Sequence, residues 1–338
     1  MEKSDLKKLS ASRIKTLQSC SWTYWANYVL KLPQATNSGA LRGSTCHSIF
    51  ELLLMPKRKK YQKSIVKAKS LEACSSVKRL VKIYLKKQKL HEQSEYDLVE
   101  KMIVVGLASD FYGKKGTKLF APEHQFDIAN LEPKYHIGGF IDKWGIDEKK
   151  KIIYIYDYKS SKAKFSGEEQ SANVQAMMYS LVAKKMYPEY KPIVVFIFLR
   201  FGDDPEQIVE FDDKILAGFE HFLEDVNSQI NNFTYADALA NLAAGQKQKG
   251  DSFSGRLMCG FSKEKGELKK DGTPKWCCPY KFGFDYFVGL DKDGKIASTE
   301  FTEKALLDDK TIADKIKSVE KRTYFGCPAF NKSSLTSF

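Results

Sequence analysis

The order of strand-like and helical runs between residues 123 and 199 restricts the fold of this chain more than any other feature. Three runs rich in β-branched and aromatic residues follow one another, punctuated by Gly138-Gly139 and a charged turn at 147–150. They cover Glu123–Ile128, Tyr135–Ile146 and Lys151–Lys159. A helical stretch at 168–186 and a buried-looking strand at 193–199 come next. This order is typical of an α/β chain whose first three strands can form a meander.

Helical patterns surround this stretch. The Ser10-Ala-Ser12 segment followed by spaced apolar and aromatic residues predicts an N-capped helix, or two short ones, through Tyr28. The glycines from Gly39 to Gly43 predict a break before a second helix, which carries His47. Three more helical segments are a basic one ending near Leu90, an amphipathic one at 96–111 and a long one at 212–230.

Composition narrows the class of protein. The 338 residues are 43% hydrophobic and 29% charged, as in ordinary globular proteins. The longest apolar run, Ile193–Leu199, is far shorter than the roughly 20 residues of a membrane helix. The charged N-terminus lacks the apolar stretch of a secretory signal, so we expect a cytoplasmic protein. The sequence also lacks a Gly-x-x-x-x-Gly-Lys-Ser/Thr loop, which argues against a fused ATP-driven motor.

The positive charge is concentrated in one segment. The chain has 55 Lys and Arg against 42 Asp and Glu, a net charge of +13. Between Pro56 and Leu90 stand thirteen basic residues and a single acidic one, Glu72. Such a stripe is expected for a polyphosphate partner, although a solvated Lys-rich helix face would have the same composition. We take as candidate nucleic-acid-binding residues Lys57, Arg58, Lys59, Lys60, Lys78, Arg79 and Lys82.

Two strand-end carboxylates are candidates for chemistry. Strand alternation over 151–159 directs Asp157 and Lys159 to one face, and a short turn would bring Asp142 beside Asp157. Paired carboxylates are the hard oxygen ligands that Mg²⁺ or Mn²⁺ prefers, although strand-end acids are also common at protein surfaces. Glu123, on the preceding strand, would either support a ligand or be exposed, and we favour exposure.

Five motifs in residues 12–179 together resemble the PD-(D/E)XK nuclease superfamily. The resemblance is to its RecB-like branch, which includes nuclease domains of recombination helicases, CRISPR-adaptation nucleases and phage exonucleases. In chain order the motifs are Ser12–Cys20 with Tyr24-x-x-x-Tyr28, Gly43-Ser-Thr-Cys-His47-Ser-Ile-Phe-Glu51, Gly139-Phe-Ile-Asp142, Asp157-Tyr158-Lys159 and Gln175-x-x-x-Tyr179. Many relatives have Glu where this chain has Asp157, and the superfamily tolerates either.

The resemblance implies a restriction-endonuclease-like core, with a small mixed sheet flanked by helices. It implies Mg²⁺ or Mn²⁺ bound by His47, Asp142, Asp157 and the backbone carbonyl of Tyr158, with Lys159 catalytic. Gln175 and Tyr179 would support the site or contact DNA, or else pack on the sheet.

The activity expected from this resemblance is that of a metal-dependent DNA nuclease. An exonuclease acting on DNA ends in recombination, repair or phage DNA processing is favoured. The alternatives are a structure-specific or CRISPR-adaptation endonuclease, or a non-catalytic nucleic-acid-binding module that keeps the fold. A recombination protein or a single-strand-binding protein is a candidate partner, and a membrane is not. The sequence leaves the oligomeric state open.

Cysteines suggest a second cofactor. Some members of the branch hold an iron–sulfur cluster with one early and three late cysteines, the later ones in a Cys-x-x-Cys arrangement, which is absent here. A distorted cluster or a zinc site would use Cys20, Cys259, one of the adjacent pair Cys277 and Cys278, and Cys327. The alternative is that these are reduced cytosolic thiols. Cys46 and Cys74 are expected to be structural.

For the domain organisation we expect one nuclease domain over 1–338. A basic helical insertion would occupy 56–115, and a Cys- and aromatic-rich extension over 245–338 would pack on the core. Within that extension, the composition of 245–255 predicts a loop.

Overall fold

The computed structural model describes residues 6–34, 36–245, 258–260, 262–308 and 310–331. The chain divides into two compact units, Met1–Ala11 with Thr36–Asn231 and Ser12–Ala35 with Asn232–Phe338. The predicted helical insertion falls in the first unit and the Cys-rich extension in the second. Nearly all of the predicted 245–255 loop lies outside the described residues. Within the described part of the chain, no helix has the length and apolar character needed to span a membrane.

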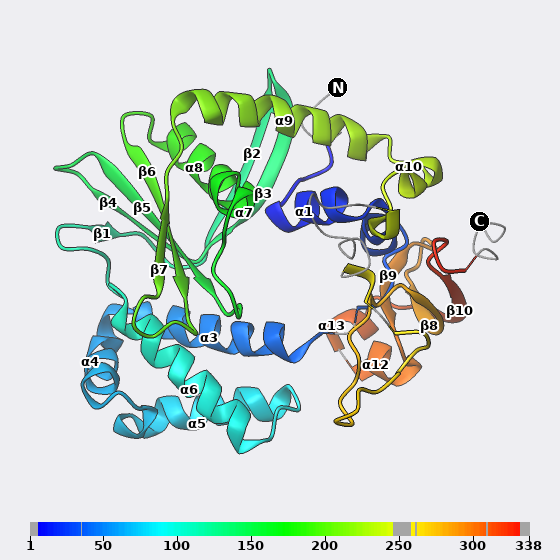
Figure 1. The fold of residues 1–338 in the computed structure, drawn as a ribbon, viewed down its shortest axis with the longest axis horizontal. Helices are drawn as coiled ribbons and strands as arrows, with labels where there is room; N and C mark the ends of the chain where they lie inside the picture. The colour runs from blue at the N-terminus through cyan, green and yellow to red at the C-terminus, as the bar shows by residue number, and fades with distance from the viewer. Residues whose placement is uncertain (1–5, 35, 246–257, 261, 309, 332–338) are drawn as a thin grey trace. The chain divides into compact units, whose positions relative to one another are not determined.

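A five-stranded mixed sheet forms the centre of the first unit (Figure 1). Its strand order is β1 (Lys118–Leu119), β4 (Lys143–Asp147), β5 (Ile152–Lys159), β6 (Lys191–Phe198) and β7 (Glu206–Val209). β5 and β6 are parallel and the other neighbours are antiparallel. The mixed sheet expected from the sequence is therefore confirmed. β1 and β7 were not predicted, because two and four residues are too few to show an alternating pattern.

The predicted meander is divided between two sheets. β2 (His124–Leu131) and β3 (Lys134–Ile141) form a separate antiparallel hairpin. The single strand expected over 135–146 is wrong, since the chain leaves the hairpin at Asp142 and enters the main sheet as β4. At this junction the Asp142 carbonyl accepts a hydrogen bond from the Glu123 N–H (3.1 Å), which ties the hairpin's start to the crossing point.

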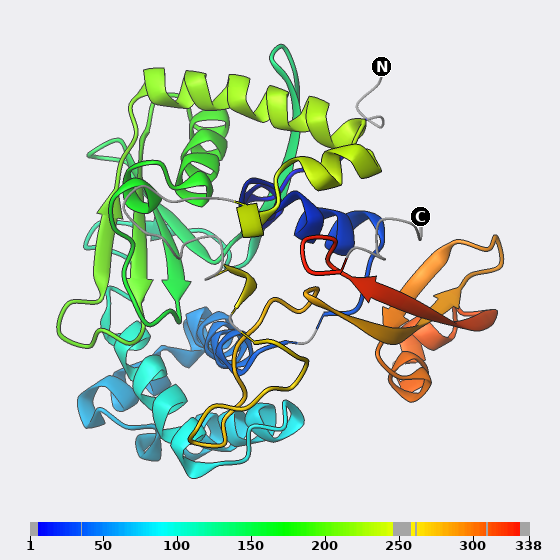
Figure 2. The ribbon, with the colours of Figure 1, turned by 45° about the vertical axis from the view of Figure 1, so that its right-hand side comes forward.

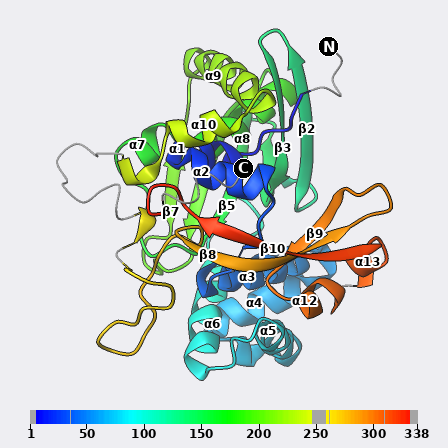
Figure 3. The ribbon, with the colours of Figure 1, turned by 90° about the vertical axis from the view of Figure 1, so that its right-hand side faces the viewer.

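Four helices cover one face of the main sheet (Figures 1 and 3). They are α3 (Ser38–Leu54), α4 (Lys59–Ala68), α5 (Ser75–Lys87) and α6 (Gln93–Ala108), with short 3₁₀ turns at Pro56–Arg58 and Leu71–Ala73. Phe50 of α3 and Met102 of α6 share one core with Tyr156 and Tyr158, which the strand alternation turns to this face. Burial of this apolar face holds the helical layer on the sheet.

The opposite face of β5 and β6 packs against α8 (Val174–Met186), and α9 (Asp213–Asn231) packs on α8 (Figure 2). The predicted helix over 168–186 is in fact two helices, because α7 (Glu168–Ser171) ends before Asn173 caps α8. The Asn173 side chain accepts the Ala176 N–H at 3.1 Å, which gives α8 its own start. This start fixes the position of Gln175 above the end of β5.

Helix α3 begins earlier than the glycines suggested. Asn37 caps it by accepting the Ala40 N–H (2.9 Å), and the helix then continues through Gly39 and Gly43. The break predicted at these glycines is therefore wrong. A Cβ on Gly43 would lie 3.0 Å from the Ser160 hydroxyl, so the glycine allows α3 to pass close to the end of β5. This close approach brings His47 to the carboxylates of the sheet.

The second unit joins the early aromatic helices to the C-terminal region. It contains α1 (Ala11–Ser19), α2 (Ser21–Tyr24), a π-helical turn at Trp25–Val29, α10 (Tyr235–Ala240) and a 3₁₀ turn at Ala243–Gly245. A three-stranded sheet follows, in the order β10 (Ser318–Gly326), β8 (Phe282–Leu290) and β9 (Ile296–Glu300), with α12 (Glu303–Asp308) packed on it and α13 (Lys310–Ala313) after it (Figure 3). Trp22 donates a hydrogen bond to the Tyr324 hydroxyl at 2.6 Å, across 302 positions of sequence.

Candidate active site

Antiparallel pairing of β4 and β5 brings the predicted carboxylates together. Lys143 lies opposite Tyr156, so Asp142 and Asp157 are the next positions along the two strands. The Asp142 carboxylate accepts a hydrogen bond from the Tyr158 N–H (3.1 Å). Asp157 is only 3% exposed, and its carboxylate lies 2.5 Å from the Lys159 ammonium nitrogen. The alternation expected over this strand therefore places Asp157 and Lys159 on one face, beside Asp142.

His47 reaches this group from α3. Its Nδ1 lies 3.3 Å from an Asp142 carboxylate oxygen, and its Nε2 lies 3.2 Å from the Tyr158 carbonyl oxygen. Burial alone would lower the pKa of His47, but the carboxylates of Asp142, Asp157 and Glu123 raise it to about 9. The site therefore has an excess of negative charge that favours a bound cation.

Glu123 joins the group from the start of the hairpin. It precedes β2 with a left-handed backbone (φ 51°), and its side chain is half-buried rather than exposed as expected. Ligand atoms of His47, Glu123 and Asp142 all lie within 4.8 Å of one another. Burial raises the pKa of Glu123, and the neighbouring Asp142 carboxylate raises it further. The predicted strand over 123–128 includes this residue but could not bring it to the site, because that position depends on the crossing of the hairpin and the main sheet at Asp142.

Lys159 and Asp157 are held by the helix above them. The Lys159 ammonium donates a hydrogen bond to the Gln175 side-chain oxygen (2.6 Å), and the Gln175 amide donates to Asp157 (2.9 Å). Tyr179, one turn later on α8, donates to the Phe140 carbonyl (2.9 Å). Burial raises the pKa of Asp157, while the adjacent Lys159 opposes that shift. Both residues of the Gln-x-x-x-Tyr motif thus contact the candidate site or its immediate support.

An open depression of about 520 Å³ lies over His47, Glu123 and Asp142. Its α3 wall carries small side chains, including Gly43, Ser44 and Ser48, beside His47. Glu51, which shares the His47 face of α3, adds an acid to the wall. Small residues leave space for a bulky ligand, and the acidic floor would repel a phosphate unless a cation lay between them.

The donor set fits a hard divalent cation. An imidazole nitrogen and two carboxylates converge, with the Tyr158 carbonyl oxygen 3.2 Å from His47 Nε2, and oxygen-rich sets of this kind suit Mg²⁺ or Mn²⁺ better than they suit thiolate-preferring metals. Asp157 lies beside this set and is paired with Lys159.

The predicted nucleic-acid-binding residues lie on the surface of the helical layer. They occupy the 3₁₀ turn after α3, the start of α4 and the first half of α5, and each is exposed or half-buried. Lys57 follows α3 at the end that carries Glu51, whereas Lys78, Arg79 and Lys82 belong to α5, which packs on α3.

Four of the predicted cysteines meet in the second unit. Cys20, Cys259, Cys278 and Cys327 line one pocket together with Trp22 and Phe330. Burial raises the pKa of Cys278 to about 11 and that of Cys327 to about 12, and repulsion from the neighbouring cysteine sulfurs adds to both shifts. Cys277 does not line the pocket, so the structure selects Cys278 from the adjacent pair. Cys46 and Cys74 are buried in the core of the first unit, as expected of structural thiols.

One family model and several solved structures match this chain. The family model described as "PD-(D/E)XK nuclease superfamily" matches residues 8–261. No curated protein matches. Among the solved structures that match is a provisionally assigned exonuclease from Eubacterium rectale, with 11% identity, a TM-score of 0.43 and coverage of 73% of this chain and 91% of that one. The family match spans most of the chain and includes every residue of the candidate site. The protein is a member of the PD-(D/E)XK nuclease superfamily.

Proposed function

We propose that this nuclease hydrolyses phosphodiester bonds of DNA with Mg²⁺ or Mn²⁺ and acts as an exonuclease on DNA ends. The observation that carries the proposal is the convergence of His47, Glu123 and Asp142 beside the Asp157–Lys159 pair. A non-catalytic binding module would be expected to lack part of this set, and none of it is missing here.

The metal ligands in this proposal are His47, Asp142, Asp157 and the Tyr158 carbonyl, with Glu123 added. A divalent ion bound there would lower the pKa of water and stabilise the charge that develops on phosphate oxygens. His47 presents a ring nitrogen to the site when it is neutral, and its raised pKa means that a cation must displace a proton. Asp142 accepts the Tyr158 N–H, which keeps its carboxylate and the Tyr158 carbonyl in fixed relation.

Lys159 is the proposed catalytic residue. Its ammonium can donate a hydrogen bond to the attacking water and offset negative charge in the transition state. Asp157 and Gln175 both contact the ammonium, so the Lys side chain is held in one orientation before the substrate binds. Tyr179 contributes by anchoring the end of the hairpin through the Phe140 carbonyl.

The basic segment supports binding of a DNA backbone near the site. Lys57, Lys59 and Lys60 follow directly after α3, at the end of that helix where Glu51 lines the depression. Lysines at this position could guide a phosphate backbone toward the metal site without reading its sequence.

We further propose that Cys20, Cys259, Cys278 and Cys327 bind an iron–sulfur cluster. A tetrahedral zinc site would bring its sulfurs to about 3.8 Å from one another. Throughout the described residues, the one group of three donor atoms within 4.8 Å is the His47 group, so no three of these sulfurs lie that close. The four thiols instead line one pocket together, as the ligands of a cluster whose irons separate its thiolates would. Iron, sulfide and zinc analysis of anaerobically purified protein tests this, and zinc without sulfide would contradict it.

The test of the nuclease proposal compares linear and circular DNA. End-labelled single- and double-stranded DNA and closed circles are incubated with the protein in Mg²⁺, Mn²⁺ or EDTA. Lys159→Ala and Asp157→Ala are compared with a matched control, Asp204→Asn, an exposed carboxylate outside the site.

We expect metal-dependent loss of linear DNA only, abolished in both site variants and retained in the control. Cut circles would make the protein an endonuclease. Tight binding without cleavage in any metal would mean that the protein is a nucleic-acid-binding module rather than an enzyme.

A further inference from the structure

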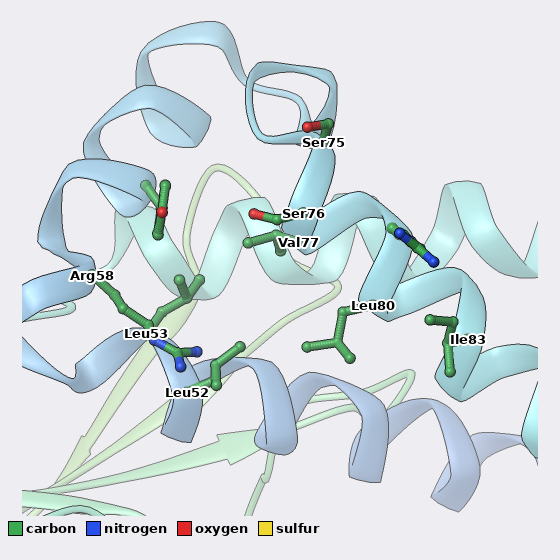
Figure 4. Close-up of a pocket in the computed structure, with 10 residues that line it drawn as sticks. Leu52, Leu53, Arg58, Ser75, Ser76, Val77, Leu80 and Ile83 are labelled. Atoms are coloured by element: carbon green, nitrogen blue, oxygen red, sulfur yellow. The ribbon is translucent and has the colours of Figure 1, made fainter.

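A second hollow lies in the helical layer, between α3, the turn after it, α4 and α5 (Figure 4). Its volume is about 760 Å³, larger than the depression over the candidate active site and within the range of ligand pockets. Figure 4 shows Leu52 and Leu53 of α3 facing Leu80 across the hollow, with Arg58 entering from the side.

This hollow is separate from the candidate active site. His47 and Glu51 face the site from α3, and a residue one position after Glu51 is rotated by about 100° around the helix axis. Leu52 accordingly lines the second hollow and does not line the site depression. A ligand in the hollow would therefore leave the metal centre open.

The hollow combines an apolar floor with a basic rim. Leu52, Leu80 and Ile83 supply aliphatic surface, and Ile83 is 49% exposed in an otherwise Lys-rich helix. Arg58 and Arg79 stand at its edge, and within the described part of the chain no carboxylate forms an ion pair with either of them. Both the aliphatic surface and the guanidinium charges are available to a ligand.

The basic rim continues along α5. Lys78, Lys82 and Lys86 recur every fourth residue and therefore form one stripe on the helix. They line an adjoining hollow of about 300 Å³ that shares Arg79 and Ile83 with the first. Together the two hollows form a groove, here called the α5 groove, whose lining on α5 runs from Ser75 to Lys86, about 16 Å along the helix axis, or the length of about five extended residues.

We propose that the α5 groove binds an acidic peptide segment of a partner protein, with a bulky apolar side chain of that segment in the hollow. Carboxylates would pair with Arg58, Arg79, Lys82 and Lys86, since Lys78 is already paired with Glu72, while the apolar side chain would cover Leu80 and Ile83. A nucleic acid also matches the rim, and Tyr61 and the two guanidinium groups offer stacking planes, but most of the floor is the aliphatic surface of Leu52, Leu80 and Ile83, which suits an apolar side chain better than a base. This assignment differs from the nucleic-acid contact predicted for Lys78, Arg79 and Lys82, and it does not depend on the proposed exonuclease activity.

The test measures peptide binding by fluorescence anisotropy with the full chain. The probe is a labelled peptide of several Asp residues followed by Leu and Phe. One control peptide has Ser in place of Leu and Phe, and a labelled single-stranded oligonucleotide is the competitor. The variants are Ile83→Asp and Arg79→Glu, and the matched control is Lys63→Glu, an exposed charge change on α4 outside the groove.

We expect saturable binding of the Asp-Leu-Phe peptide that weakens by about tenfold or more in both groove variants, equivalent to about 1.4 kcal/mol. Binding should be unchanged in Lys63→Glu and much weaker for the Ser peptide. Ile83→Asp should cleave free DNA at the wild-type rate, which shows that it is folded and separates this proposal from the nuclease proposal. Equal binding of the Ser peptide, or retained binding by Ile83→Asp, would overturn the proposal that an apolar side chain of the peptide occupies the hollow. Displacement of the peptide by the oligonucleotide, with DNA binding abolished in Arg79→Glu, would assign the groove to nucleic acid.

Discussion

At the scale of single residues, Gln175 links the two catalytic candidates. It accepts from the Lys159 ammonium and donates to the Asp157 carboxylate, so one side chain fixes both. Because its role would act through these two side chains, we treat it as a positioning residue. Partners of this kind commonly change metal affinity or activity by about 10- to 100-fold when they are removed.

Gln175→Met removes these two hydrogen bonds, and a third to the Tyr179 hydroxyl (2.8 Å), while keeping the length of the side chain. We expect the cleavage rate to fall about 10- to 100-fold and the metal concentration for half-maximal activity to rise, because Lys159 and Asp157 become mobile. Rates measured across a Mg²⁺ series check this. Gln93→Met, an exposed change at the start of α6, is the control. A lower rate with an unchanged metal requirement would mean that Gln175 positions Lys159 but not Asp157.

Glu123 provides a second test at this scale. Its carboxylate approaches His47 and Asp142, whereas Glu51 only lines the wall of the depression. Glu123→Gln should therefore weaken Mn²⁺ binding by about tenfold, and Glu51→Gln should change it much less. Calorimetric titration of each variant with Mn²⁺ measures this without relying on activity. Equal affinities in the two variants would remove Glu123 from the ligand set.

The residues that the sequence could indicate are those set by one strand or one helix. Alternation along β5 was enough to pair Asp157 with Lys159, and four-residue spacing was enough to put His47 and Glu51 on one face. Glu123 was judged exposed, since its environment comes from a backbone turn with positive φ and from a junction between two sheets. Local periodicity contains no information about such a junction.

At the scale of elements, the long helices and the buried strands were predictable, but their ends and interruptions were not. Apolar periodicity identified α9, and the β-rich run at 193–199 identified β6. Glycines in α3 suggested a break, although Gly43 serves close packing against Ser160. The run at 135–146 looked continuous because a single Asp at 142 is too weak a local signal to end a strand. In both cases tertiary contacts outweigh local propensity.

Two helix glycines give a matched pair of predictions. A Cβ on Gly106 of α6 would lie 2.3 Å from the Phe50 ring and 2.9 Å from Leu199, whereas a Cβ on Gly218 of α9 would meet nothing within 4 Å. Gly106→Ala should lower the free energy of unfolding by about 1–3 kcal/mol through overpacking. Gly218→Ala should raise it by about 0.5–1 kcal/mol through helix propensity. Urea denaturation of both variants decides the signs, and a stabilised Gly106→Ala would mean that α6 can shift away from α3.

The β2–β3 hairpin should make a pH-dependent contribution to the free energy of unfolding. Hydrogen bonds from Lys8 and His136 lower the pKa of Asp127 to about 2. A carboxyl group with a lowered folded-state pKa stabilises the protein above its unfolded value near 4, and this stability is lost as the pH falls toward 2. Asp127 is 40% exposed, so we expect Asp127→Asn to cost about 1 kcal/mol or less at pH 7 and the difference from wild type to shrink between pH 5 and pH 3. Denaturation across this pH range is the measurement, and a constant difference would exclude the carboxylate charge as the cause.

At the scale of the whole molecule, sequence position is a poor guide to where segments assemble. The second unit combines Ser12–Ala35 with a region that begins at Asn232, far along the chain. No local pattern indicated its three-stranded sheet, which depends on contacts such as that between Trp22 and Tyr324. The cysteines show the same dependence, because folding brings Cys20 to the pocket lined by Cys278 and Cys327.

Positive charge can attract DNA to the whole molecule or bind it at one segment. Two triple variants that remove the same charge from different places distinguish these effects. Lys57, Lys59 and Lys60 lie after the Glu51 end of α3, whereas Lys149, Lys214 and Lys292 are exposed at positions elsewhere in the chain. Changing either set of three to Gln removes the same net charge. If the first set binds phosphates, its replacement should weaken DNA binding and reduce the slope of log K against log salt by about 0.7–0.9 for each phosphate that is no longer neutralised.

The control set should change neither affinity nor slope by a comparable amount, since it removes the same net charge but none of the lysines of the 57–60 segment, and exposed charges are screened over about 10 Å at moderate salt. Filter binding with the Lys159→Ala background, across a salt series and without cleavage, provides both quantities. Equal slopes for the two triple variants would exclude Lys57–Lys60 from the DNA path and leave only the general positive field of the protein to attract its substrate.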